Sequence, residues 1–461
     1  MSANVNKLLQ DKVVQSRAGG KSLMNPNNNN NAADVQPASG IQAWGVVGLA
    51  AGAQAVSNID QAVVGLAAEP IMEELSLTTA QYGFVAGSLY TLYSVGGIAV
   101  GLLAAPRFSP RSILIVMLLL WSLSQLPIVL AASFTVLVAC RVVLGAAGGA
   151  GTATSMNICH EWFPDNRRSV PSSLLMVGGP IGTMVAAPAL TYIIIYYGWR
   201  SAFLTCAVLG LVVMFGFLLV RRNGPYAAEP VPDQKVHEAP GEFRRLVLDP
   251  TIIGNALVGL CAYWVIGFMM AWLAPYVRDQ GGLSAMSSGW ALSFIFLAQS
   301  IIVVAVAALS QRLLNAGYSS RVGRSYVMVA CLLGSAACFI AMALVTNGAA
   351  RLVLVTLATS LAGSIFALSS AMITEVVPGA ERYRLMTITF ALVTLSALVS
   401  PGLAGASIEL GATHGWRFAL LQIAAVGVIG GLIGLRTLHP AATIARFSSG
   451  SAAAVDAKDS S

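Results

Sequence analysis

Two charged residues lie inside long apolar stretches of the sequence, where charge is costly. Asp60 is the only acidic residue well inside such a stretch, 42–66, and Arg141 is the only basic one, in 134–158. A carboxylate can bind and release a proton, and a guanidinium can hold an anion by charge-assisted hydrogen bonds. Charges at membrane depth usually face a cavity and carry function. We therefore take Asp60 as a candidate proton-coupling site and Arg141 as a candidate anion site.

The apolar stretches that position these two residues make up most of the chain. Of the 461 residues, 56% are hydrophobic and only 10% are charged, whereas soluble proteins have about 25% charged residues. Runs of about 20 apolar residues indicate membrane helices, and these runs are too long and too continuously apolar for barrel strands. The sequence predicts an all-α membrane protein with twelve transmembrane helices, at 42–66, 81–104, 112–132, 134–158, 172–196, 201–220, 251–277, 289–313, 326–345, 350–373, 386–408 and 417–437.

The basic residues orient these helices. If both termini lie in the cytoplasm, the only basic residues in the outward loops and helix ends are Arg200, Arg278, Arg351 and Arg417. This distribution agrees with the positive-inside rule. We therefore expect a multi-pass protein of the cell membrane, the inner membrane if the cell is bacterial. The formal charge of +7 then reflects topology, and no nucleic-acid partner is expected.

An internal repeat divides the chain into two halves. "HEWFPDNRRSV" followed by "YGWRSAF" in the first half matches "TEVVPGAERYR" followed by "HGWRFAL" in the second. A duplicated six-helix unit is typical of transporters that work by alternating access. The expected units are a disordered tail at 1–40, a half at 41–220, a cytoplasmic linker at 221–250, a half at 251–438 and a tail at 439–461.

Several motifs resemble the major facilitator superfamily, and within it the anion:cation symporter group. They are "NIDQAVVGLAAEPI" in the first span, "RVVLGAAGGAGTATSMNICHEWFP" in the fourth, the two "GWR" motifs and "WLAPYV". The resemblance covers residues 42–437. It implies a major facilitator fold, transport of organic anions such as sugar acids or aromatic carboxylates, and spans one and four as neighbours on a central cavity.

This resemblance would let Asp60 and Arg141 meet, since both lie about 11 Å from the outer ends of their spans at about 1.5 Å per residue. The pair is either a structural ion pair or one that also responds to protonation or anion binding. The group places Arg and Glu where this chain has Gln61 and Gly148. Asp60 would then be the one carboxylate left for a proton.

The same resemblance shows altered cytoplasmic gates. Pro106 in "APRFSPR" and Gln311 in "LSQRLL" stand where an Asp is expected, which predicts a weak lock on the cytoplasmic side, unless other polar contacts replace it. The repeated loop charges are either salt-bridge latches or a solvated face. The gating candidates are Arg107, Arg111, Glu161, Arg167, Arg168, Arg312, Glu375, Arg382 and Arg384.

Polar and aromatic residues in the spans expected to line the cavity complete the candidate site. Each also has a packing interpretation. Besides Arg141, the substrate-binding candidates are Asn58, Gln61, Tyr90, Tyr93, Asn157, Tyr263, Trp264, Gln299 and Thr394.

No enzyme class fits the sequence. It has no phosphate-binding Gly-rich loop, no plausible Ser–His–Asp set, and no metal-ligand spacing among its cysteines. We expect no cofactor and no metal, a lipid bilayer, a small molecule and protons as partners, and a functional monomer. The leading hypothesis is a proton-coupled secondary transporter of a small organic anion, such as a carboxylate. The alternatives are an efflux antiporter for amphipathic compounds, favoured by "GGPIGT" at 178–183, and a sensor or scaffold.

Overall fold

The computed structural model describes residues 40–105, 107–164, 167–220, 223–226, 242–377, 379–410 and 414–446. The expected tails at 1–40 and 439–461 and the linker at 221–250 lie largely outside these ranges, as does Pro106. The side chains of Arg382 and Arg384 are also outside the described part of the chain.

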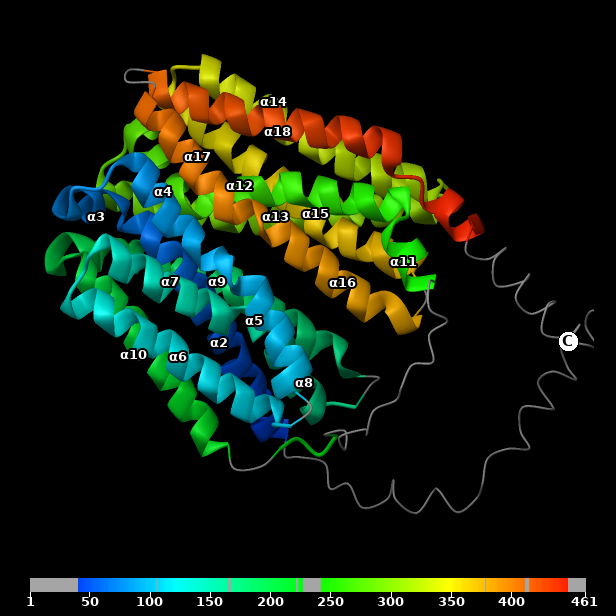
Figure 1. Ribbon diagram of the computed structural model, residues 1–461, viewed down its shortest axis with the longest axis horizontal. Coiled ribbons are helices and arrows are strands. Elements are labelled where there is room, and N and C mark those ends of the chain that lie inside the picture. The colour runs from blue at the N-terminus through cyan, green and yellow to red at the C-terminus, as the bar shows by residue number, and fades with distance from the viewer. Residues whose placement is uncertain are drawn as a thin grey trace, which may run out of the picture.

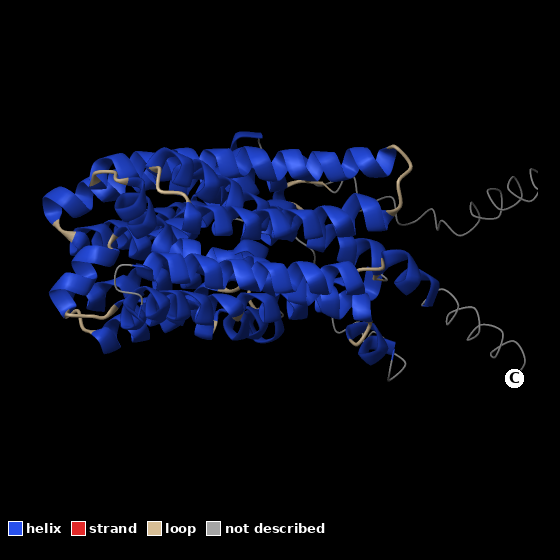
Figure 2. Ribbon diagram, turned by 90° about the horizontal axis from the view of Figure 1, so that it is seen from above, coloured by secondary structure: helices blue, strands red, loops and turns tan. Residues whose placement is uncertain are grey.

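The described residues form an all-helical bundle (Figures 1 and 2). The first half contains α2 (Gly40–Leu66), α3 (Ala68–Leu75), α4 (Thr79–Ser88), α5 (Tyr93–Ala99), α6 (Pro110–Leu130), α7 (Phe134–Gly148), α8 (Gly151–Trp162), α9 (Ser169–Tyr197) and α10 (Trp199–Leu219). A short 3-10 turn, Leu89–Thr91, and a π turn, Val100–Ala104, continue the span that α4 begins.

The second half repeats this arrangement. It contains α11 (Glu242–Val247), α12 (Pro250–Gly281), α13 (Ala285–Asn315), α14 (Val327–Leu344), α15 (Gly348–Val376), α16 (Gly379–Thr394), α17 (Ser396–Leu410) and α18 (Gly415–Thr437). A π-helical turn, Arg321–Tyr326, precedes α14. The breaks between α4 and α5, between α7 and α8, and between α16 and α17 interrupt single spans.

Eleven helical segments of the described chain are long and apolar enough to cross a membrane, and each overlaps one predicted span. The one predicted span without a counterpart among these eleven is the first in the chain, 42–66, which is α2. It is helical over 27 residues, but it contains Gln54, Asn58, Asp60 and Gln61 and is less apolar than the eleven. Instead of facing lipid on all sides, α2 packs against α8, α9, α10 and α12. The most polar span thus contacts four other helices.

The two halves meet most closely at the end of the bundle that carries α3, called here the α3 end (Figure 1). There α4 packs against α17, and α9 against α13. Thr79 Oγ1 donates to the Gly405 carbonyl at 2.8 Å, and an ion pair joins Glu69 to Arg278. Hydrogen bonds between the halves continue as far as Ser94 and Thr394, whose hydroxyls are 2.6 Å apart.

Glycines bring the helices of the two halves into backbone contact. A Cβ built on Gly83 would lie 2.2 Å from the Pro401 carbonyl oxygen, and one on Gly87 would lie 2.3 Å from that of Leu398. Neither position accepts a side chain unless α4 and α17 move apart. Small residues at such interfaces let membrane helices approach closely.

The repeated "GWR" motifs occupy equivalent places at the α3 end. The Trp199 indole and the Arg200 guanidinium both donate to Glu74 of α3, at 2.8 and 2.7 Å. In the second half, Trp416 hydrogen-bonds Asp279 in the last turn of α12. Each half thus ties the start of its sixth span to a carboxylate at or beyond the end of its first span.

The Glu74 contact gives a first, small prediction. Hydrogen bonds from Arg200, and then from Trp199, hold the pKa of Glu74 below its ordinary value. A depressed folded-state pKa stabilises the protein above the unfolded-state pKa, about 4.3, and this stabilisation is lost as pH falls through the folded-state pKa. We expect Glu74→Gln to lower the melting temperature at pH 7 by a few degrees at most, because exposed ion pairs contribute little.

Thermal unfolding of the purified protein at pH 7 and near pH 4 checks this, with Glu73→Gln as the matched control. The difference between Glu74→Gln and wild type should shrink at the lower pH. A difference that stays constant with pH would contradict the assignment.

Candidate functional site

Asp60 and Arg141 meet inside the first half. Both side chains are only 2% exposed, on α2 and α7. Arg141 Nη1 donates to the main-chain carbonyl of Asp60 at 2.9 Å. The Asp60 carboxylate faces Cys206 of α10 and Gln125 of α6 instead. The predicted proximity of the two residues is confirmed. Among the described residues, however, the Asp60 carboxylate and the Arg141 guanidinium do not form the expected ion pair.

This arrangement leaves several buried polar atoms without hydrogen-bond partners in the described part of the chain. They are Asp60 Oδ1, Arg141 Nε and Nη2, Gln125 Nε2 and Trp121 Nε1. Buried polar groups are nearly always hydrogen-bonded, so a cluster of exceptions calls for an explanation. The free atoms comprise one carboxylate oxygen of Asp60 and donors on Arg141, Gln125 and Trp121. The site can therefore accept an anion, a proton or a water molecule.

Two small voids adjoin these residues, and Gln61 and Leu89 line both. One is lined by Arg141 and Tyr90 together with Met270 of the second half. The other is lined by Asp60 with Tyr93, Trp121 and Gly148. Each has a volume of about 10 Å³, which is about the space that one water molecule needs. Arg141 thus lines one void and Asp60 the other.

Tyr90 and Tyr93 line these voids, and Tyr90 contacts an aromatic residue of the second half. Tyr90 contacts Tyr93 and Tyr263, with ring centroids 5.8 Å apart in both pairs. Tyr263 also contacts Phe366 at 5.3 Å and Phe390 at 6.2 Å, in edge-to-face geometry. The Tyr90 hydroxyl donates to Gln61 Oε1 at 3.3 Å. We call these five rings the aromatic cluster. It connects the predicted residues Tyr90, which lines the Arg141 void, and Tyr93, which lines the Asp60 void, to Tyr263 of the second half. The fourth predicted residue, Gln61, accepts the Tyr90 hydrogen bond.

The other predicted substrate residues lie elsewhere. Asn58 donates to the Gln54 carbonyl and faces Gly179 of α9. Asn157 is exposed on α8, and Gln299 lies against Gly363 of α15. The Trp264 carbonyl accepts a bond from Ser400 in its own half, and Thr394 belongs to the Ser94 contact between the halves. The structure does not bring these five to Arg141.

The first-half gating candidates contact their own half. Arg107 donates to the Leu103 carbonyl, and Arg111 donates to the Phe217 carbonyl at the end of α10. Arg168 donates to the Phe163 carbonyl, and Arg167 is exposed. Glu161 accepts a hydrogen bond from the backbone at Gly224. The contacts described for these residues fasten loops to helix ends.

The second-half candidates behave similarly. Glu375 pairs with Arg324 and accepts a bond from Ser320 at 2.7 Å, both within the second half. Arg312 is exposed on the last turn of α13. Sequence reasoning missed Arg324, because its partner Glu375 lies 51 positions away and only the fold brings the two together.

The "GGPIGT" motif serves close packing. Cβ atoms built on Gly178, Gly179 and Gly182 would lie 2.4–2.6 Å from Ala51, Asn58 and Ala55 of α2. The motif therefore lets α9 approach α2, and the helix that carries Asp60 is held by backbone contact.

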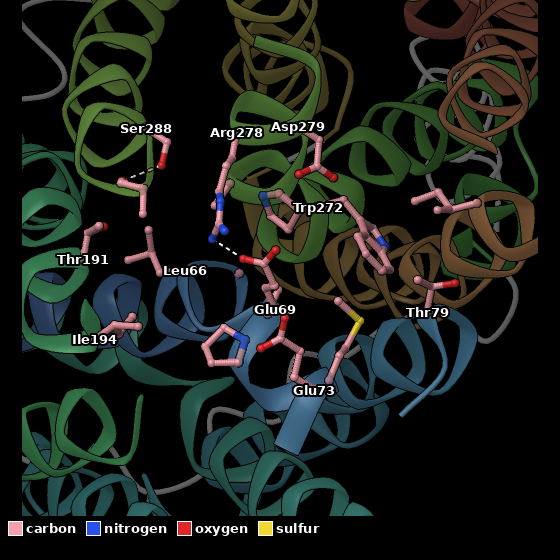
Figure 3. A pocket seen from close by; sticks show the side chains of 18 of the residues that line it. Leu66, Glu69, Glu73, Thr79, Thr191, Ile194, Trp272, Arg278, Asp279 and Ser288 are labelled. Atoms are coloured by element: carbon pink, nitrogen blue, oxygen red, sulfur yellow. Dashed lines mark hydrogen bonds and ion pairs between the residues drawn. The ribbon is translucent and has the colours of Figure 1, made fainter. Parts of the chain in front are cut away.

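A larger pocket of about 420 Å³ lies at the α3 end between the halves. Figure 3 shows Glu69, Glu73 and Asp279 around it, with Arg278 bonded to Glu69. Sequence reasoning did not identify this pocket, because it forms only where loops of both halves converge. Arg141 and Asp60 do not line it.

Four residues at the central site also escaped sequence reasoning. Gln125 carried a usable signal, since it is an amide in the middle of the apolar run 112–132. Trp121 and Tyr82 resemble ordinary packing residues, although the Tyr82 hydroxyl donates to the Val64 carbonyl one helical turn from Asp60. Cys206 also resembles a packing residue in the sequence; it is a buried cysteine without a disulfide and faces the Asp60 carboxylate.

Comparisons with known proteins place the chain in a family. A family model described as Major Facilitator Superfamily matches residues 50–318 and 312–453. The chain is 24% identical over 375 residues to a hexuronate transporter of Bacillus subtilis (strain 168), covering 79% of this chain and 88% of that protein. It is 25% identical over 295 residues to a probable sulfoacetate transporter of Cupriavidus necator, covering 61% of this chain and 67% of that protein.

Solved structures share the fold. A bacterial homologue of the human lysosomal transporter Spinster, in an inward-facing and unoccupied conformation, matches with a TM-score of 0.76 at 16% identity, covering 89% of this chain and 99% of that one. A D-xylose–proton symporter matches with a TM-score of 0.71 at 15% identity, and the match covers 86% of this chain and 98% of that one. The chain therefore belongs to the Major Facilitator Superfamily, whose members are membrane transporters and not enzymes.

Proposed function

We propose that this protein is a secondary active transporter that moves a small organic anion, a carboxylate, together with a proton by alternating access. The observation that carries the proposal is Arg141, a buried guanidinium with two unpartnered nitrogens next to a buried carboxylate. Hexuronate and sulfoacetate, the substrates for which two relatives are named, are both organic anions.

Arg141 binds the anion in this proposal. Its Nη1 is engaged by the Asp60 carbonyl, so Nε and Nη2 remain to donate to a substrate carboxylate. Two parallel N–H donors on one guanidinium match the two oxygens of a carboxylate. The backbone bond fixes the orientation of the guanidinium without using the edge that the substrate needs.

Asp60 carries the proton. An ionised Asp60 and a charged Arg141 together are neutral, and an arriving anion would leave one buried negative charge uncompensated. Buried net charge is strongly unfavourable, so proton uptake by Asp60 restores neutrality. Cys206 and Gln125 face its carboxylate. Anion binding and protonation thus favour one another although they occur at different side chains.

The structure corresponds to an inward-facing state in this proposal. The predicted orientation places the α3 end outside, and contacts between the halves run from that end to Ser94 and Thr394. The gating arginines contact carbonyls of their own half, as expected for an open cytoplasmic side. The two halves at 41–220 and 251–438, joined by the linker, work as a monomer in the cell membrane with both termini in the cytoplasm.

The glycine contacts give a prediction about this conformational equilibrium. We expect Gly87→Val to shift the protein toward the outward-open state, because the new side chain would collide with the Leu398 backbone only when the α3 end is closed. Spin labels at the α3 ends of α4 and α17, in a cysteine-free background in nanodiscs, should report a distance longer by several ångströms.

Gly45→Val is the matched control, since a Cβ built on Gly45 meets nothing within 4 Å. Its distance distribution should equal that of the parent protein. An unchanged distribution in Gly87→Val as well would show that the close contact does not govern closure.

Transport in proteoliposomes tests the proposal as a whole. A panel of labelled carboxylates is offered to the purified protein under an imposed proton gradient. We expect gradient-driven uptake of at least one member. Extrusion of amphipathic dyes in place of carboxylate uptake would favour the antiporter alternative. No flux of either kind, from protein that is folded by its melting curve, would favour the sensor or scaffold.

A further inference from the structure

Two of the unpartnered buried atoms belong to residues that line the Asp60 void. Asp60 Oδ1 and Trp121 Nε1 have no hydrogen-bond partner in the described part of the chain, and both residues line this void. Each residue is only 2% exposed. An ionised carboxylate only accepts hydrogen bonds, and an indole N–H only donates one. The lining of the Asp60 void therefore supplies one free acceptor and one free donor.

Gly148 marks the edge of the void to which this donor is closest. A Cβ built on Gly148 would lie 3.9 Å from Trp121 Nε1 and 3.3 Å from the Tyr93 ring. Gly148, Trp121 and Tyr93 all line the void, so the indole nitrogen borders the space next to Gly148. The void has a volume of about 10 Å³, which is about the space that one water molecule needs. A carboxylate or a sugar does not fit there.

The chemistry of the lining selects the occupant. The occupant must accept a hydrogen bond from Trp121 Nε1 and donate one to Asp60 Oδ1, and a water molecule can do both at once. A metal cation cannot accept from an N–H group. In addition, the described residues contain no cluster of three or more His, Cys, Asp or Glu that could hold a metal ion. A small anion would be repelled by the ionised carboxylate.

We infer that one ordered water molecule bridges Trp121 Nε1 and Asp60 Oδ1, and that Trp121 is a positioning residue for the proton step. The inference rests on the proposed function and deepens it, because it names groups that determine how readily Asp60 releases its proton. The water donates to the ionised carboxylate and accepts from the protonated one. The hydrogen bond from Trp121 holds the water in place in both states.

The position of the void along α2 suits the release of a proton. Ser57, which lines the Asp60 void, precedes Asp60 by about one helical turn, whereas Val64, which lines the Arg141 void, follows it by about one turn. In the predicted orientation α2 runs outward, so the water lies on the cytoplasmic side of Asp60. A transporter that carries a proton inward leaves its carboxylate ionised on this side.

Few other groups support the ionised carboxylate. Arg141 of α7 and Cys206 of α10 are the charged and titratable groups that face it, and Tyr93 of α5 lines the same void. The Arg141 guanidinium donates to the main-chain carbonyl of Asp60, and a thiol is a weak donor. A hydrogen bond from the water therefore favours the ionised form of Asp60, and loss of the water favours the protonated form.

High-resolution structures of the full-length protein test the site directly. We expect density for one water within about 2.7–3.2 Å of both Trp121 Nε1 and Asp60 Oδ1. In Gly148→Ala the new methyl group occupies this space, and the density should disappear. Gly45→Ala is the matched control, since a Cβ built on Gly45 meets nothing within 4 Å, and it should retain the water. A wild-type map that shows other buried waters but none here, or a cation here, would overturn the inference.

Infrared titration of the purified protein tests the effect on Asp60 without any substrate. The carbonyl stretching band of protonated Asp60 is identified by its loss in Asp60→Asn, and its intensity is followed against pH. Loss of one hydrogen bond to a charged group should raise the midpoint by about one pH unit. We expect this change in Gly148→Ala and in Trp121→Phe, which removes the N–H donor. The double variant should shift no further than either single variant, because both remove the same water.

Controls separate this effect from general changes in packing. Trp290→Phe, at a tryptophan of α13 that is 56% exposed, should titrate as wild type, as should Gly45→Ala. A wild-type midpoint in folded Gly148→Ala and Trp121→Phe, or fully additive shifts in the double variant, would overturn the inference and leave the proposed function standing. A bridging water in a protein that transports no carboxylate would instead overturn the proposed function and leave the water site standing.

Discussion

We expect the Arg141→Gln variant to bind its organic anion at least about 30-fold more weakly than wild type. Truncating one partner of a buried, hydrogen-bonded charge pair costs about 2–5 kcal/mol, and each 1.4 kcal/mol is a factor of ten. Glutamine can still donate to the Asp60 carbonyl, but it brings no charge and no second donor edge. Isothermal titration of detergent-solubilised protein with the anion identified by uptake measures the change directly.

Controls separate this loss from misfolding. Arg141→Gln leaves the Asp60 carboxylate buried without a cation, which is destabilising by itself. The double variant Asp60→Asn/Arg141→Gln removes both charges and should regain the wild-type melting temperature without regaining anion binding. Arg141→Lys keeps the charge but loses the two-donor edge, so it should bind with intermediate affinity. Wild-type affinity in a folded Arg141→Gln variant would disprove the anion-site role.

The helices follow from the sequence because membrane burial leaves the backbone little choice. With no water in the bilayer core, a long apolar segment must satisfy its hydrogen bonds internally. Each of the runs at 112–132, 172–196 and 251–277 accordingly became one helix, α6, α9 and α12. The exception in composition, α2, was still predictable as a helix, since its polar residues are too sparse to interrupt it.

The site was predictable only in part, because residue type does not fix where a side chain points. Asp60 and Arg141 were expected to meet, and they do, since the fold places α2 near α7. Their expected ion pair failed because α10 and α6 supply Cys206 and Gln125 at the carboxylate. The sequence around Asp60 does not show which residues of other helices will contact its carboxylate.

The direction in which each helix face points explains why some predicted substrate residues do not lie at Arg141. Asn58 lies only two residues from Asp60, a rotation of about 200° at about 3.6 residues per turn, so it faces α9 instead of Arg141. Asn157 lies beyond the break between α7 and α8 at Gly149–Ala150 and is exposed. Tyr90 and Tyr93 are three residues apart, which places them on one helix face, and their rings contact each other.

The Asp60→Asn variant should lose proton-driven accumulation while it retains exchange. Asparagine is nearly the same shape as a protonated aspartate but cannot release a proton. Substrate exchange needs no net proton movement, so labelled anion should still equilibrate across the membrane.

The position that carries Glu in the anion:cation symporter group is Gly148 here, and a Cβ there would already lie 3.3 Å from the Tyr93 ring. A second carboxylate therefore has little room beside Asp60.

One preparation of Asp60→Asn in proteoliposomes tests the coupling account most directly. The same vesicles are assayed for counterflow and for accumulation of labelled carboxylate under a proton gradient, beside wild type. The account predicts counterflow within a few-fold of wild type and no accumulation above equilibrium. Undiminished gradient-driven accumulation would contradict it, because the proton would then be carried by a group other than Asp60.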